Sequence, residues 1–133
     1  MNLQGCIDEL LVSGTEDWVC NADFRGVARD IGGVQDSDKR ETFAIELMRE
    51  VVRQGLMEIG DLPEGDTGQR PLPLKKWPGT PEEWLDRIER EWPKRRGEAE
   101  YGVYCWFQNT VKGDEIARQI LAKRDKASQA DDM

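Results

Sequence analysis

The sequence predicts an α+β domain that is dominated by helices and has a small sheet of two or three strands. Five segments place apolar residues three and four positions apart, as an amphipathic helix does, and short β-prone runs lie between them. The chain has 133 residues, 38% of them hydrophobic, with five Trp. That length supports one sizeable hydrophobic core.

The first third of the chain is predicted to form two helices joined by a short apolar run. The first helix spans residues 2–13, and Ser13-Gly14 is expected to end it. Trp18-Val19-Cys20 is predicted as a strand or a buried turn. Asn21 is expected to cap the second helix, over residues 22–30. The residues predicted to face the core are Leu3, Ile7, Leu10, Leu11, Phe24, Val27, Ala28 and Ile31.

A longer helix is predicted over residues 38–54, within the stretch SDKRETFAIELMREVVRQGLMEIGDL. Its apolar pairs recur one helical turn apart, which gives a broad core-facing stripe. The pairs are Phe43/Ala44, Leu47/Met48 and Val51/Val52. Gly55 is expected to end this helix in the left-handed conformation. A strand then follows over residues 56–60.

The second half begins with a long segment rich in Pro and Gly between Leu62 and Thr80, which predicts a loop. Thr80-Pro81-Glu82-Glu83 has the features of a helix start, and that helix is expected to pack Trp84, Leu85, Ile88 and Trp92 on one face. Tyr101–Phe107 is the most β-prone stretch. Asn109-Thr110 is expected to cap a last helix, which buries Ile116, Ala117, Ile120 and Leu121.

The order of these elements matches a winged-helix architecture, and two local patterns resemble that family. Residues 51–57, VVRQGLM, look like the third helix passing into the first wing strand, and residues 106–115, WFQNTVKGDE, resemble the return strand and its Thr-x-x-Gly helix start. The chain is also similar to small uncharacterised bacterial proteins that carry Asp-Trp-Val early, Gly-Leu-Met in the middle and Asn-Thr-x-x-Gly-Asp late; here these are residues 17–19, 55–57 and 109–114.

The resemblance implies a single winged-helix-like domain over residues 1–123, with a small antiparallel sheet. Residues 62–97 would form an extended wing with an inserted helix, and the polar residues 124–133 are predicted to be a disordered tail. Such families include transcription regulators and adaptors that bind no DNA. The long wing departs from the usual short hairpin.

Composition removes several classes of function. The chain has no His, which excludes the usual Ser-His-Asp, Cys-His and histidine–metal sites. Cys6, Cys20 and Cys105 form no C-x-x-C pair and are expected to be reduced thiols in a cytoplasmic protein. No membrane segment, metal, cofactor or catalytic carboxylate pair is predicted. The segment 61–68 lacks the spacing of a calcium-binding EF-hand loop. Because the usual catalytic groups are missing, we expect that the protein is not an enzyme.

The net charge of −8 and the pI near 4.7 favour a basic protein partner and disfavour DNA, whose phosphates need Lys and Arg. The helix over 38–54 has four basic and four acidic residues, so a neutral outer face is predicted and the helix is interpreted as scaffold. The leading hypothesis is a non-enzymatic bacterial protein, such as an immunity or antitoxin protein that masks a basic effector. A winged-helix DNA-binding regulator is the alternative, and a homodimer is also possible.

The predicted contact surface lies in the insertion. It combines an aromatic side chain with basic residues around the inserted helix, a combination enriched in binding hot spots. The candidates are Trp77, Arg87, Arg90, Lys94, Arg95 and Arg96. In the competing interpretation Trp77 packs on Trp84 and the basic residues only aid solubility.

Overall fold

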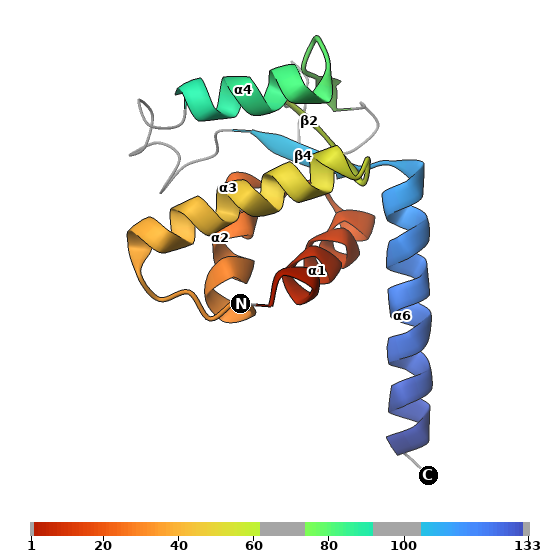
Figure 1. The fold of residues 1–133 in the computed structure, drawn as a ribbon. Helices are drawn as coiled ribbons and strands as arrows, with labels where there is room; N and C mark the ends of the chain where they lie inside the picture. The colour runs from red at the N-terminus through yellow and green to blue at the C-terminus, as the bar shows by residue number, and fades with distance from the viewer. Residues whose placement is uncertain (1, 62–73, 92–104, 132–133) are drawn as a thin grey trace.

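The computed structural model describes residues 2–61, 74–91 and 105–131, and these form an α+β fold dominated by helices (Figure 1). Its elements follow the predicted order, with one additional short strand. They are α1 (Leu3–Glu16), β1 (Val19–Cys20), α2 (Asn21–Asp30), α3 (Ser37–Arg53), β2 (Met57–Asp61), β3 (Lys75–Lys76), α4 (Pro81–Glu91), β4 (Trp106–Asn109) and α6 (Val111–Asp131).

The strands form one antiparallel sheet in the order β1-β4-β2-β3. Phe107 of β4 pairs with Val19 on one side and with Ile59 on the other. The sheet therefore joins the beginning, the middle and the end of the chain. The additional strand β3 lies in the segment that was predicted as a loop, and it pairs with the end of β2 through Gly60 and Lys76.

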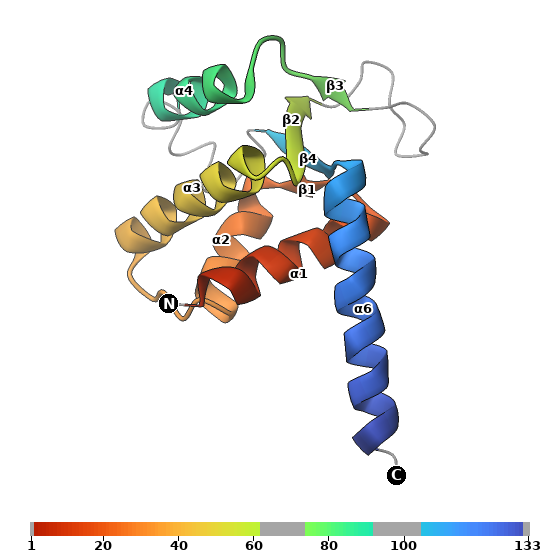
Figure 2. The same cartoon turned by 45° about the vertical axis from the view of Figure 1, so that its right-hand side comes forward.

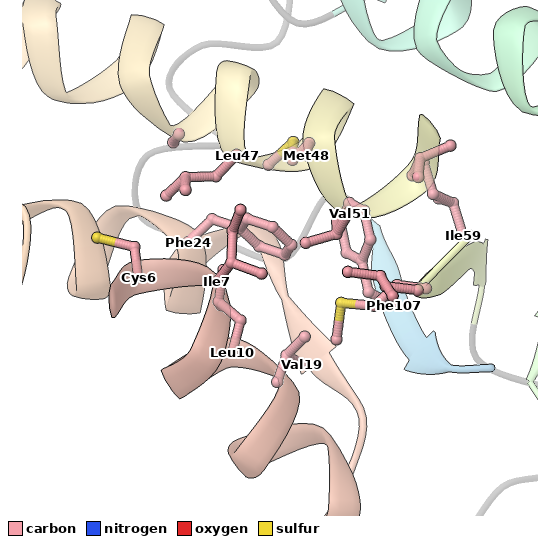
Figure 3. Packing of buried hydrophobic residues seen from close by; sticks show 14 of the residues in the cluster. Cys6, Ile7, Leu10, Val19, Phe24, Leu47, Met48, Val51, Ile59 and Phe107 are labelled. Carbon is pink, nitrogen blue, oxygen red and sulfur yellow. The ribbon is translucent and has the colours of Figure 1, made fainter. Parts of the chain in front are cut away.

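The core is built where α1, α2 and α3 pack against one face of the sheet (Figures 1 and 2). Figure 3 shows side chains from all three helices meeting those of β1, β2 and β4. The rings of Phe24 of α2 and Phe107 of β4 contact each other, with centroids 4.4 Å apart and planes tilted by 48°. The stripe predicted on α3 is confirmed, because Leu47, Met48 and Val51 are fully buried.

Three predicted boundaries are wrong. α1 does not end at Ser13-Gly14 but continues to Glu16, because Gly14 serves close packing: a Cβ there would overlap the side chain of Asn109. Asn21 is not an N-cap outside α2. It is the first helical residue, and its buried amide oxygen accepts a hydrogen bond from Cys105 N at 3.3 Å.

The third wrong boundary is at the C-terminus. Residues from 124 onward were predicted as a disordered tail, yet α6 is helical to Asp131 and extends past the rest of the domain (Figure 2). Its first half packs on α1 through the buried Ala117, while Leu121 stays exposed. The ion pair of Arg124 with Glu9 of α1, at 3.0 Å, lies beyond the predicted end of the domain.

Residues of two short motifs named above, Gly-Leu-Met at 55–57 and Asn-Thr-x-x-Gly-Asp at 109–114, contact each other. Thr110 Oγ1 accepts a hydrogen bond from Gly113 N at 3.1 Å and donates one to Gly55 O at 2.6 Å. It thus caps α6 and ties it to the end of α3. A Cβ on Gly113 would overlap the carbonyl oxygen of Leu56. These residues fix how α6 sits against the α3–β2 turn.

Candidate functional site

Trp77 is buried, with 3% of its surface exposed, so the prediction of an exposed aromatic contact residue is wrong. Its backbone nitrogen donates to Ile59 O at 2.9 Å, which extends the β2–β3 pairing. The indole nitrogen of Trp84 donates to Trp77 O at 3.0 Å, as the competing interpretation of a Trp77–Trp84 contact predicted. Trp77 therefore belongs to the core under α4.

Of the other predicted contact residues, the structure describes Arg87 and Arg90. The Arg87 guanidinium lies 3.9 Å from the centroid of the Trp77 ring and also contacts the Glu91 carboxylate at 3.3 Å. Arg87 thus covers the buried Trp77 through a cation–π contact. Arg90 is exposed on α4. Lys94, Arg95 and Arg96 lie outside the described residues.

Helix α4 is acidic rather than basic and packs along the outer side of α3 (Figure 1). Trp84, Leu85 and Ile88 hold it to the core. Its remaining side chains include five acids and two arginines, at positions Glu82, Glu83, Asp86, Glu89, Glu91, Arg87 and Arg90. α4 therefore adds negative charge to the side of α3 that it covers.

Two acids of α4 pair with arginines of α3. Arg53 forms a two-pronged contact with Glu82, with Nε–Oε1 at 3.0 Å and Nη2–Oε2 at 3.3 Å. That contact holds the pKa of Glu82 below its ordinary value, chiefly through the hydrogen bond from Arg53. Arg49 forms an ion pair with Glu89. Both arginines face α4 as a result.

Arg49 and Arg53 thus lie beside the acids of α4, and they also line a hollow together with Glu46 and Glu50 of α3. Residues four apart form rows along a helix, and Arg49 and Arg53 lie on the row next to α4. Asp38, Thr42, Glu46 and Glu50 occupy another such row, which is exposed over its first three members and half-buried at Glu50. At 1.5 Å per residue this acidic row is about 18 Å long.

Two hollows adjoin the acidic row and share Glu46. The first has a volume of about 320 Å³ and is lined by Val34, Asp38, Lys39, Thr42, Phe43 and Glu46. Its floor is apolar, because Val34 and Phe43 are buried while the other four side chains are more exposed. The second, of about 240 Å³, is lined by Leu3, Glu46, Arg49, Glu50 and Arg53.

Sequence reasoning missed this surface because it summed the charges of α3. The sum is zero, but α4 pairs with Arg49 and Arg53, and Asp38, Thr42 and Glu46 stay exposed. The four-residue spacing of Asp38, Thr42, Glu46 and Glu50 was the available signal. The sequence alone did not show that α4 would lie beside Arg49 and Arg53.

The three thiols are buried away from this surface. Burial raises the pKa of Cys6 and of Cys20, and raises that of Cys105 well above its ordinary value. Each is therefore held as a neutral thiol, which is a poor nucleophile and a poor metal ligand. Within the ranges that the structure describes, no three Cys, Asp or Glu side chains come together as a metal site, and no helix there could cross a membrane.

No protein-family model matches this chain, and no curated protein or solved structure is significantly similar to it.

Proposed function

We propose that this chain is a non-enzymatic protein that acts by binding a basic protein partner, as an immunity or antitoxin protein does when it masks an effector. The observation that carries the proposal is the pairing of Arg49 and Arg53 of α3 with Glu89 and Glu82 of α4. That pairing places acids of α4 beside two of the four basic residues of α3, while Asp38, Thr42 and Glu46 lie exposed beside a hollow.

Electrostatics supports the same kind of partner. The net charge of −8 would raise the association rate with a positively charged surface and repel nucleic acid. We place this interaction in the cytoplasm, where thiols stay reduced, because all three cysteines are free and buried.

The experiment is an affinity purification from cells of the source organism, followed by reconstitution. The immobilised chain is compared with a Glu46→Lys/Glu50→Lys variant, and retained proteins are identified by mass spectrometry. We expect a protein of high pI that the variant fails to retain and that forms a stoichiometric complex when purified. An acidic partner, or turnover of any substrate in a broad activity screen, would contradict the proposal.

We further propose that the fold is winged-helix-like, with α4 carried in an extended wing over residues 62–97. The element order α1, β1, α2, α3, β2, with β4 paired between β1 and β2, supports this assignment. The same arrangement favours the alternative function, a DNA-binding regulator that would place α3 in the major groove.

Charge opposes that alternative, because two of the four basic residues of α3 are already paired within the chain. Binding to a mixed-sequence DNA duplex at low salt separates the two functions. We expect none. Binding that weakens steeply as salt rises would instead support the regulator, because it reports release of counterions from phosphates.

A further inference from the structure

We infer that the hollow over Phe43 receives one apolar side chain of the partner, and that Glu46 pairs with a Lys or Arg next to that side chain. The inference rests on the proposed function and assigns its contact surface to α3. It differs from the sequence-based hypothesis, which placed contact on the inserted helix.

The floor of the hollow is held in place before any partner binds. Val34 N donates to Ala28 O at 3.0 Å, and Arg40 donates through Nε to Val34 O at 3.0 Å. Phe43 lies so close to Gly32 that a Cβ at position 32 would come within 2.8 Å of its ring. A preformed pocket loses little conformational entropy on binding, so a short segment can bind there.

The size and chemistry of the hollow fit a single apolar anchor. Its volume of about 320 Å³ is at the lower end for ligand pockets, and Val34 and Phe43 give it an apolar base. Thr42 lies on the rim, and its hydroxyl already bonds to the Asp38 carbonyl at 3.1 Å. An aliphatic or aromatic side chain would bury the remaining apolar surface of the floor.

The charge of Glu46 on the rim favours a basic residue next to the apolar side chain of the partner. Glu46 is exposed and lines both hollows, so a cation beside it lies next to the bound apolar side chain. Lys39 disfavours a cation at the opposite end of the first hollow. In the second hollow Arg49 and Arg53 contact the acids of α4. The partner would therefore pair its Lys or Arg with Glu46.

The probe is a set of capped synthetic peptides with one Leu or Phe placed one to four residues from one Arg. Matched peptides replace the Arg with Glu or the apolar residue with Ser. Binding to the full-length chain is followed by ¹⁵N–¹H NMR titration. We expect the Leu–Arg and Phe–Arg peptides to shift the amides of Thr42, Phe43 and Glu46, and both matched sets to bind at least tenfold more weakly.

Three variants of the chain decide the assignment, after circular dichroism shows that each is folded. Glu46→Lys removes the proposed cation site, and Thr42→Trp fills the hollow. Glu115→Lys makes the same charge change on the exposed side of α6 and serves as the control. We expect the first two to weaken peptide binding at least tenfold and the control to change it less than twofold.

Two results would overturn the inference. One is equal weakening by Glu46→Lys and Glu115→Lys, which would reduce the effect to net charge. The other is the absence of binding by every peptide in the set. Neither decides the proposed function, because the reconstituted complex with the whole partner protein tests that separately.

Discussion

Replacing Ile88 by Ala tests whether α4 is part of the core. Ile88 is fully buried, although α4 was predicted to lie in a long insertion. The substitution removes three carbons, which is worth about 2.4 kcal/mol at ~0.8 kcal/mol per methylene. A cavity that does not collapse adds roughly 1.5 kcal/mol at ~24 cal/mol per Å³. We therefore expect a loss of about 2.5–4 kcal/mol of unfolding free energy.

Urea unfolding followed by circular dichroism measures this loss. Arg90→Ala is the matched control on the same helix, because Arg90 is exposed and we expect a change within ~0.5 kcal/mol. A loss below about 1 kcal/mol for Ile88→Ala would refute the packing of α4 on α3. It would also remove the basis for the pairing of Arg49 and Arg53 with α4.

Three further predictions concern the fold. Gly113→Ala should lower stability by more than ~1 kcal/mol because its Cβ would overlap Leu56 O, whereas Gly26→Ala, with open space around it, should raise stability by ~0.5–1 kcal/mol; thermal unfolding compares the two. Thr110→Val should cost ~1–2 kcal/mol in urea unfolding, because it removes the cap of α6. Burial raises the pKa of Cys105, so the unfolded chain loses its proton first and stability should fall above pH 9. Cys105→Ala should remove much of that fall, and the native thiols should react slowly with Ellman's reagent.

The helices could be predicted because their apolar periodicity determines which side is buried. The stripe on α3 and the inward face of α4 follow from spacing alone, and Gly55 ends α3 with a positive φ of 72°, as predicted. The end of α1 could not be predicted, because Gly14 does not end the helix. A side chain at position 14 would overlap that of Asn109, which comes from the other end of the chain. Strand β3 has only two residues, and its pairing with β2 sets its position rather than any propensity of its own.

The candidate surface was misplaced for a related reason. Trp77 was predicted to be exposed because it is an aromatic residue next to basic ones. Its backbone hydrogen bond to Ile59 O instead places it beside β2 and under α4. The spacing of the acidic row of α3 is visible in the sequence. The summed charge of the helix hides this row, because the basic residues balance the acids. Local spacing predicts which residues share a row, and only the packing of α4 determines which row remains exposed.

That division of charge can be tested directly, because α4 is held by its apolar side chains as well as by its acids. A Glu82→Gln/Glu89→Gln variant keeps Ile88 and its neighbours in place but removes the carboxylates that face Arg53 and Arg49. We expect it to elute from heparin at higher salt than the wild-type chain, because two arginines become available to an anion. A Glu83→Gln/Glu115→Gln variant makes the same change in net charge elsewhere and should shift elution less. If the two variants elute together, net charge alone governs anion binding, and α4 does not mask the arginine row of α3.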